Sequence, residues 1–402
     1  MLGFDWWVNG VLDLSVWQKV VATLIMTQVT IVSVTLYLHR HSAHNSLDLH
    51  PVLKHFFRLW LWMGTGTNTK EWTAIHRKHH AKCETKDDPH SPAVKGLKRV
   101  FWQGAELYRD EALNTETLER FGQRTPDDWV ERNVYGRHKL KGIALMFVLD
   151  VLFFGVAGIT VWAVQMIWIP FFAAGVINGL GHAWGYRNFE CKDAATNIVP
   201  WGILIGGEEL HNNHHTYPNS AKLSVKPWEF DIGWFWIQLF SFFGLAKARN
   251  IAPVAITNDT KNELDTDAIK AIIHNRFHVL SEYHKKVMVP VINEQKAKMQ
   301  RNERAAYRKA KLLLTREPKL VKEKEVARID LMLEQNQMIK VIYEKSQELQ
   351  EIWKRNPGSR IPEKLGELME WCRQAEQSGI TALEEFAAQL KCYSLVQTSY
   401  SR

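Results

Sequence analysis

The chain has 402 residues with a formal net charge of +8 at pH 7, and 46% of its residues are hydrophobic. Its 17 tryptophans fit side chains at lipid–water interfaces, and the basic balance fits anionic headgroups or an acidic partner better than nucleic acid. Its four cysteines include no Cys-x-x-Cys pair, which argues against a disulfide framework, a zinc ribbon or an iron–sulfur cluster.

The first predicted element is a membrane helix. The N-terminal segment, residues 1–13, is short and lacks the basic stretch of a cleavable signal peptide. The apolar run of residues 14–38 is long enough to cross a bilayer. Its one interior charge, Lys19, lies near an end, where the side chain can reach the interface.

This run leads into a first histidine cluster. His39 and His44 would diverge by about 140° on an ideal helix, so they converge only if the helix ends or distorts between them. His41 points in another direction and is left out of the candidate site. We expect His39 and His44 to emerge at one membrane face.

The next apolar run, residues 53–67, is short and contains Lys54, His55 and Arg58. If it crossed the membrane once, the histidine clusters on either side of it could not share a metal site. We therefore expect this run to lie in the interface, or to dip in and return.

A second cluster follows in the stretch of residues 70–141, which is rich in Lys and Arg and is placed on the cytoplasmic side by the positive-inside rule. On a helix, His76, His79 and His80 cover one face about 100° wide. Three basic side chains beside the histidines are expected to stay in solvent: Arg40, Arg77 and Lys78.

Residues 142–181 have the length of two membrane crossings, a hairpin interrupted by Asp150 and Gln165. Asn178 and His182, four residues apart, share one helix face. Such a pair alone is more often packing than ligand, but beside the other clusters the balance shifts toward ligand. The sequence thus predicts an all-α membrane protein with three crossings and one in-plane or re-entrant helix.

A third cluster, His211, His214 and His215, repeats the His-x-x-His-His spacing of the second. Imidazole is the commonest protein ligand for iron, zinc and copper. The clustered histidines exceed what one ion can use, so the repeat suggests two ions held side by side. Clusters that share two ions must also share one membrane face.

After the predicted membrane domain, residues 14–250, the chain becomes rich in Lys and Glu and largely helical in pattern. One interpretation of residues 251–402 is a solvated cytoplasmic helical extension. The other is a docking surface for a redox partner or for membrane headgroups.

Together these motifs resemble the integral-membrane fatty acyl desaturases, and most of all the branch of the stearoyl-CoA Δ9 desaturases in a bacterial form. The resemblance covers residues 14–245. It extends beyond the histidine clusters to three further stretches: Glu84–His90, Asn178–Arg187 and Gly207–Pro218.

The resemblance implies a mushroom-like fold, with a transmembrane stem under a cytoplasmic cap that carries a non-haem di-iron site. The implied iron ligands are nine histidines, His39, His44, His76, His79, His80, His182, His211, His214 and His215, with Asn178 acting through a water molecule. Carboxylates near the clusters are candidates to hold the second ring nitrogens of these ligands, or are ordinary surface groups: Glu84, Asp88, Glu208 and Glu209.

The implied reaction uses O2 as co-substrate to place a cis double bond, at Δ9, in a saturated acyl chain. Two electrons come from the acyl chain and two from outside. The sequence contains no His-Pro-Gly-Gly haem-binding stretch, nucleotide-binding loop or cysteine cluster. We therefore expect a separate electron donor, either a ferredoxin-like protein or a flavin/iron–sulfur reductase.

The chain departs from the animal acyl-CoA enzymes at two places. Their Arg-Asp pair, which contacts the coenzyme, is Ala74-Ile75 in this sequence, and a tryptophan three residues before their asparagine is Gly175. The first change leaves both CoA and a membrane phospholipid open as the acyl carrier. The second alters the shape of the substrate tunnel.

Two other functions compete with the desaturase interpretation. A membrane alkane ω-hydroxylase uses similar histidine boxes, but with different spacing and with more membrane helices. A metal transporter or store would need ligands along a path through the bilayer, whereas these histidines gather at one face.

The expected location of the protein is a bacterial inner membrane, with the active site on the cytoplasmic face.

Overall fold

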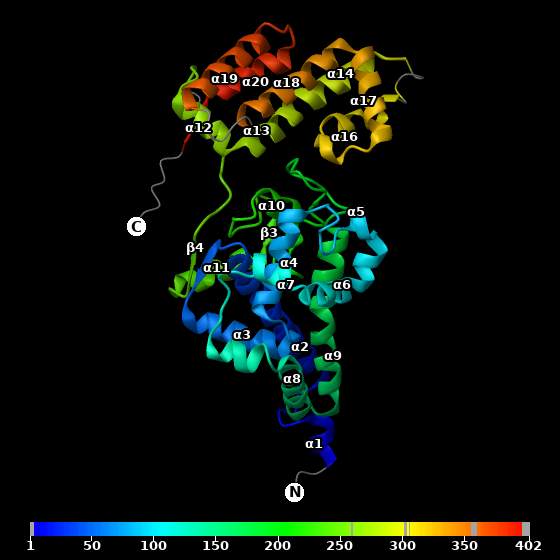
Figure 1. Cartoon of the computed structure of the whole chain (residues 1–402), viewed down its shortest axis with the longest axis vertical. Helices are drawn as coiled ribbons and strands as arrows, with labels where there is room; N and C mark the ends of the chain where they lie inside the picture. The colour runs from blue at the N-terminus through cyan, green and yellow to red at the C-terminus, as the bar shows by residue number, and fades with distance from the viewer. Residues whose placement is uncertain (1–3, 259, 301–303, 305, 355–359, 396–402) are drawn as a thin grey trace. The chain divides into compact units, whose positions relative to one another are not determined.

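The computed structural model describes residues 4–258, 260–300, 304, 306–354 and 360–395. Residues 1–3 of the predicted N-terminal segment and residues 396–402 of the predicted extension lie outside this set. The chain divides into two compact units (Figure 1). They are unit 1, residues 1–187 with 193–252, and unit 2, residues 188–192 with 253–402.

Unit 1 is mostly helical in the residues described. Its helical segments are, in chain order, α1 (Phe4–Asn9), α2 (Val16–Val32), η1 (Ser33–Ala43), α3 (Pro51–Thr65), α4 (Thr69–Lys82), α5 (Pro92–Lys95), α6 (Leu97–Ala112), α7 (Thr115–Phe121), η2 (Glu131–Tyr135), α8 (Lys139–Phe154), η3 (Gly155–Ala157), α9 (Gly158–Ile169), η4 (Pro170–Leu180), α10 (His211–Thr216) and α11 (Ile232–Phe242). Its strands form two short pairs, antiparallel β1 (Leu47–Leu49) with β4 (Ala246–Ala248) and parallel β2 (Trp201–Gly202) with β3 (Phe230–Asp231).

The first long helix joins α2 and η1 without a break. It begins at a capping box, in which Ser15 Oγ accepts from the Gln18 backbone N–H and the Gln18 side chain accepts from the Ser15 N–H. η1 continues the helix as a π-helix. The joined helix therefore carries the first histidine cluster at its C-terminal end.

The short helix α3 begins with Pro51 in its first turn, where the missing N–H costs nothing. Arg58, in its middle, is buried and donates to both Asp128 and Glu131, with N···O distances of 2.6–3.2 Å. The charge that interrupts this apolar run is thus satisfied by carboxylates that follow α7 in the chain. This anchors α3 to the segment that leads into α8.

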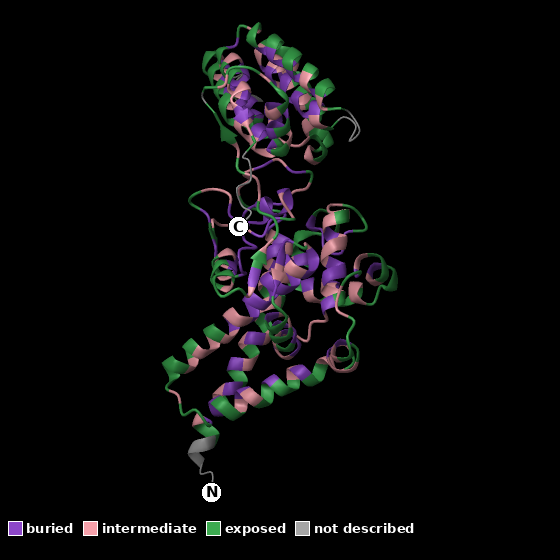
Figure 2. Cartoon of the chain, turned by 90° about the vertical axis from the view of Figure 1, so that its left-hand side faces the viewer, coloured by how far each residue is buried: buried purple, intermediate pink, exposed green. Residues whose placement is uncertain are grey.

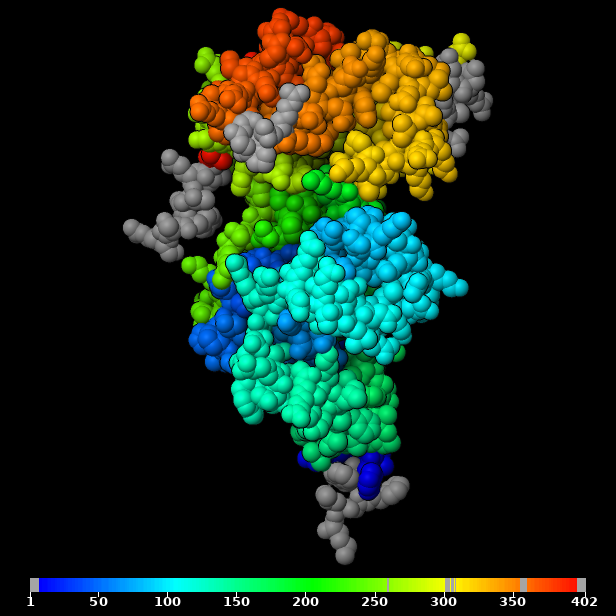
Figure 3. Space-filling model, viewed as in Figure 1, coloured from blue at the N-terminus to red at the C-terminus, as the bar shows by residue number. Residues whose placement is uncertain are grey.

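α8 and α9 form a helical hairpin that turns at η3 (Figure 1). Gly155 has φ +66°, a left-handed conformation that L side chains rarely adopt, so glycine suits this turn. Gln165 Nε2 donates to Asp150 Oδ2 at 2.9 Å, which pairs the two polar groups that interrupt the apolar sequence. In the space-filling view the hairpin forms one end of unit 1, beside the N-terminal segment (Figure 3).

Two helical stretches of the described residues are long and apolar enough to cross a membrane: Val16–Ala43 and Lys139–Leu180, the second of which contains the hairpin. α11 is apolar but shorter. The long helices carry buried and exposed residues side by side along their length (Figure 2). The predicted count of three crossings plus one in-plane helix stays a prediction.

Unit 2 is a bundle of helices with one short antiparallel pair, β5 (Ile256–Thr257) with β6 (Tyr393–Ser394). Its helical segments include α12 (Thr266–His274), α13 (Arg276–Tyr283), η5 (His284–Met288), α14 (Val289–Lys298), η6 (Ala306–Lys309), α16 (Ala310–Leu314), η7 (Pro318–Leu320), α17 (Glu323–Gln335), α18 (Gln337–Lys354), α19 (Ile361–Glu376) and α20 (Thr381–Lys391). A core of its own runs from Ile269 to Tyr393 and includes Tyr283, Trp371 and Phe386. The helical pattern expected for residues 251–402 is present, and apolar residues spaced along separate helices form this core. The expectation of a solvated cytoplasmic extension stays a prediction.

α6 and η4 pack at backbone distance, which gives a first prediction. A Cβ added at Gly175 would lie 2.5 Å from the Phe101 carbonyl oxygen, whereas one at Gly179 would meet Leu97 Cδ1 at 3.5 Å. Gly175→Ala should therefore destabilise the protein by about 1–3 kcal/mol through overpacking. Thermal unfolding in detergent should show a lower Tm for Gly175→Ala than for the wild-type protein. The matched control Gly179→Ala should keep the wild-type Tm. Equal Tm values for the two variants would contradict the close approach.

Candidate metal centre

The first histidine cluster lies on the π-helix η1. A π-helix is closed by i→i+5 hydrogen bonds, and the His44 N–H donates to the His39 carbonyl at 3.0 Å. Residues five apart therefore come to one face, and the rings of His39 and His44 are 4.7 Å apart. The sequence required a distortion at this point, and the π-helix provides it. His41 lies outside the groups described below, and its Nδ1 is 2.7 Å from the Leu47 carbonyl oxygen.

The other two clusters lie on α4 and α10. The Asn68 side chain caps α4 by accepting from the N–H groups of Lys70 and Glu71. All of α10 is buried, and Asn213, inside the third cluster, donates to Glu229 Oε2 at 2.9 Å and to the Leu223 carbonyl at 3.0 Å. These bonds fix the short helix that carries three of the histidines.

Five imidazoles form a first group: His39, His44, His76, His80 and His214. The Nε2 atom of His214 lies 3.1 Å from that of His39 and 2.9 Å from that of His80. The Nε2 atoms of His44 and His76 are 2.8 Å apart. η1, α4 and α10 thus place their ring nitrogens around one point.

The remaining four imidazoles form a second group: His79, His182, His211 and His215. The Nε2 atoms of His182 and His211 are 3.0 Å apart. The two groups adjoin, because the rings of His80 and His215 stack with centroids 4.3 Å apart. All nine histidines predicted from the sequence therefore lie together in two neighbouring groups.

These residues fit a pair of metal ions. A divalent ion binds imidazole nitrogen at about 2.0–2.1 Å, so two ligands at right angles lie about 3.0 Å apart, close to the observed Nε2···Nε2 distances of 2.8–3.1 Å. Burial, reinforced by the neighbouring imidazoles, holds the pKa of His76, His80 and His214 well below its usual value. The histidines are thereby kept in the neutral form that binds metals. His215 Nε2 is buried, with no hydrogen-bond partner among the described residues.

Two of the predicted carboxylates contact the outer ring nitrogens of histidines as expected. Glu208 Oε1 lies 2.8 Å from His39 Nδ1, and Asp88 Oδ1 lies 3.0 Å from His79 Nδ1. The Glu208–His39 contact has the distance of an ion pair but not the geometry of a hydrogen bond. A carboxylate can only accept, so the Nδ1–H of His79 must donate to Asp88. That tautomer leaves the Nε2 lone pair available for a metal ion.

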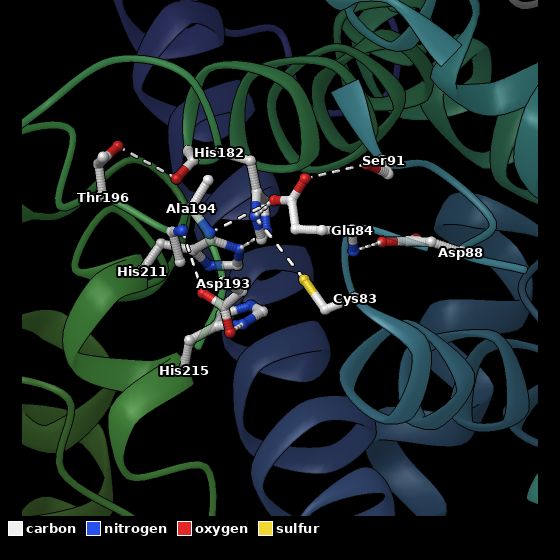
Figure 4. A network of polar contacts seen from close by, with 12 residues as sticks. Cys83, Glu84, Asp88, Ser91, His182, Asp193, Ala194, Thr196, His211 and His215 are labelled. Carbon is white, nitrogen blue, oxygen red and sulfur yellow. Dashed lines mark hydrogen bonds and ion pairs between the residues drawn. The ribbon is translucent and has the colours of Figure 1, made fainter. Parts of the chain in front are cut away.

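Two more histidines of the second group are held in the same way (Figure 4). Glu84 Oε1 lies 3.2 Å from His182 Nδ1, and Asp193 Oδ2 lies 3.0 Å from His215 Nδ1. Glu84 was predicted for this role. Ser91 Oγ donates to the second Glu84 oxygen at 3.2 Å and helps to orient that carboxylate.

Glu209, the fourth predicted carboxylate, does not contact a histidine. Its Oε1 accepts from the backbone N–H groups of Leu204 at 2.7 Å and Ile205 at 3.0 Å. Burial raises the pKa of Glu209 to about 7. Its position shapes the loop before α10 rather than the ligand shell.

The prediction that three basic side chains stay in solvent is wrong. Arg40 is buried, lies 2.9 Å from Asp231 Oδ1 and donates to two carbonyls. Arg77 donates to the carbonyls of Ser42 and Ala43, and Lys78 lies 2.8 Å from Glu111 Oε1. Arg77 thereby ties α4 to the end of η1, while Arg40 ties η1 to β3 and Lys78 ties α4 to α6.

Asn178 lies half-buried near the end of η4, four residues before His182. Within the described part of the chain, no hydrogen bond involves its side chain. Ala74 and Ile75, which replace the coenzyme-contacting pair of the acyl-CoA enzymes, are both buried on α4.

Three residues near the site were not predicted. Asp193 comes 22 residues before its partner His215, and no spacing pattern marks it. His90 stacks near His79, with ring centroids 4.3 Å apart, and its N–H donates to Asp88 Oδ1. Cys83 lies one helical turn after His79 at the end of α4, a spacing that could have found it.

Paired histidine groups beside long apolar helices are typical of the class of membrane proteins with multi-histidine metal sites, and the groups in this chain could hold metal ions. A family model described as fatty acid desaturase matches residues 15–243, more than half of the chain. A second family model, described as transposase, matches residues 266–397 in unit 2, a smaller part of the chain.

Several curated proteins are similar to unit 1. The Delta-9 acyl-lipid desaturase 1 of Arabidopsis thaliana is 27% identical over 57% of this chain and 74% of its own length. The sn-2 palmitoyl-lipid 9-desaturase of Nostoc sp. (strain 36) is 32% identical over 54% of this chain and 75% of its own length. The acyl-CoA 5-desaturase AL21 of Anemone leveillei is 30% identical over 53% of this chain and 65% of its own length.

The chain therefore belongs to the fatty acid desaturase family, in its Δ9 branch. It is an oxidoreductase of lipid metabolism that acts on acyl lipids or acyl-CoA.

The carboxylate–histidine contacts give a second prediction. Asp88→Asn replaces the acceptor for His79 Nδ1–H and should lower the affinity for Co²⁺ by about 10–100-fold, because outer carboxylates orient ligand imidazoles. The matched control is Asp87→Asn, since the Asp87 side chain is exposed and pairs only loosely with Lys82, at 3.5 Å. Competition titration with a chelator measures the Co²⁺ affinity of each variant. Equal affinities for the two variants would remove Asp88 from this role.

Proposed function

We propose that the protein is an O2-dependent desaturase that places a cis Δ9 double bond in a saturated acyl chain carried by a membrane phospholipid, using a non-haem di-iron centre. The observation that carries the proposal is the pair of adjoining histidine groups, with His80 stacked on His215 at 4.3 Å. A single-ion site would not use nine buried or half-buried imidazoles. The membership of the family supports the same chemistry.

One iron would be held by the five-histidine group and the other by the four-histidine group, with Asn178 acting on the second through a water molecule. When bound, the irons supply the redox chemistry by which O2 is reduced while two C–H bonds break. The chain's own contribution is to fix neutral imidazoles through the carboxylates of Glu208, Asp88, Glu84 and Asp193.

The electron count requires a partner. Reduction of O2 to two water molecules takes four electrons, and removing two hydrogens from the acyl chain yields two. An external donor, a ferredoxin-like protein or a flavin/iron–sulfur reductase, supplies the other two electrons, and two protons come from solvent.

We propose that residues 251–402 form a cytoplasmic domain, in addition to the membrane desaturase domain of residues 14–250.

The membrane arrangement follows from the shared site. The helix of α2 and η1 crosses once, the α8–α9 hairpin crosses twice, and α3 lies in the interface. The Arg58 contacts support this placement of α3, because Asp128 and Glu131 belong to the basic stretch on the cytoplasmic side. We place the protein in a bacterial inner membrane, with the metal centre in a helical cap on the cytoplasmic face.

A phospholipid is the proposed acyl carrier. Ala74 and Ile75 are apolar and buried, so the position that contacts coenzyme A in the animal enzymes has no charged group to offer. Two of the reported relatives are named as acyl-lipid or palmitoyl-lipid desaturases, and one is named as an acyl-CoA desaturase. Acyl-CoA is therefore the second candidate.

Product analysis tests the reaction. Expression in a host that lacks unsaturated fatty acids should yield chains with a double bond between carbons 9 and 10, located by mass spectrometry of derivatised products. His79→Ala removes an inner imidazole and should abolish the product, while His55→Ala, at an exposed position, should leave it unchanged. Recovery of hydroxylated chains alone would favour the hydroxylase instead.

The carrier is tested by supplying the substrate in two forms. Purified protein in vesicles, with a reductase system, receives labelled stearoyl groups either on phospholipid or on CoA. Unsaturated label should appear in the phospholipid-fed vesicles without added CoA. Product only from labelled acyl-CoA, formed before label enters phospholipid, would assign CoA as the carrier.

A further inference from the structure

Cys83 lies at the edge of the four-histidine group. It is the residue that ends α4, four positions after His79, so the two side chains share one helix face. Its Sγ is 3.9 Å from His79 Nε2, the nitrogen that faces away from Asp88, and 4.0 Å from His182 Nδ1. Figure 4 shows the sulfur directed toward His182, with His215 on the same side.

The distance to His79 Nε2 is within the reach of a shared ion, whereas His182 Nδ1 is the nitrogen held by Glu84 and shows only that the sulfur lies beside that ring. A metal ion binds thiolate sulfur at about 2.3 Å and imidazole nitrogen at about 2.1 Å, so sulfur and nitrogen on one ion lie at most about 4.4 Å apart. The ligand atoms of His79, Cys83, His182 and His215 all lie within 4.8 Å of one another. Cys83 can therefore reach the ion after a small movement of its side chain.

The surroundings point to a ligand independently of the sulfur. The His215 side chain is only 1% exposed, and its Nδ1 is held by Asp193. Its other nitrogen, Nε2, has no hydrogen-bond partner among the described residues. A buried imidazole nitrogen without a hydrogen-bond partner has a lone pair that can bind a cation. Thiolate is a stronger and softer donor than a water molecule at such a position.

We propose that the Cys83 thiolate is a fifth protein ligand of the ion held by His79, His182, His211 and His215. The inference rests on the proposed metal centre and adds a residue to it. When the Sγ–metal bond forms, the thiol proton passes to solvent, and no electrons are exchanged. Each ion would then have five protein ligands, and the two sites would differ in charge by the thiolate.

X-ray absorption on the full chain loaded with Co²⁺ tests this directly. The wild-type protein should bind two cobalt ions, with an average of one sulfur neighbour per two ions at about 2.3 Å. The thiolate should also give a charge-transfer band in the near ultraviolet. Cys83→Ser should keep two cobalt ions and lose both signals.

The matched control is Cys392→Ser, which removes an equally half-buried thiol that contacts the Lys261 carbonyl in unit 2 and should keep both signals. Two bound cobalt ions with nitrogen and oxygen neighbours only would overturn the role of Cys83 and leave the histidine centre standing. Failure of the wild-type protein to bind two ions, with no difference from His79→Ala, would overturn the proposed centre and this ligand with it.

Discussion

The rest of unit 1 depends on bringing nine imidazole nitrogens to two neighbouring points. The ligands come from four separate segments: η1, α4, the turn after η4, and α10. A metal–nitrogen bond tolerates little variation in length, so each segment must hold its backbone closely in place. The remaining contacts hold these segments in place relative to one another. The Arg40–Asp231 ion pair joins η1 to β3, and Arg77 ties α4 to the end of η1.

Burial and charge then act together on the ligands. Burial favours neutral imidazole, and a carboxylate on Nδ1 selects the tautomer whose Nε2 is free to bind. Glu208, Asp88, Glu84 and Asp193 each hold one histidine, so the carboxylates surround the site without entering it. The imidazoles of the two groups stay uncharged, and the negative charge lies outside them by one imidazole ring.

Helical periodicity could group the histidines of the second and third clusters because it is local: residues three and four apart share a face in any α-helix. The full set of nine ligands was implied by the family resemblance. Helical periodicity could also show that the helix must distort between His39 and His44, although not that the distortion is a π-helix. Sequence reasoning failed where the partner is distant in the chain. Arg40 was expected in solvent, but it pairs with Asp231, which lies 191 residues away in the chain. Asp193 was not predicted for the same reason, because its partner His215 lies 22 residues further along the chain.

Two of the four π-helical segments in the described residues, η1 and η4, lie beside the histidine groups. η1 ends the first long apolar helix, and η4 ends the second helix of the α8–α9 hairpin. Hydrogen-bond geometry in a π-helix is less favourable than in an α-helix, so such segments persist mainly where a function needs them. In η1 the wider turn aligns His39 with His44. In η4 it coincides with the close approach of α6 at Gly175, and it precedes Asn178 and His182. An ideal α-helix could not bring His39 and His44 to one centre, so the departure of η1 from that geometry is what the histidine group requires.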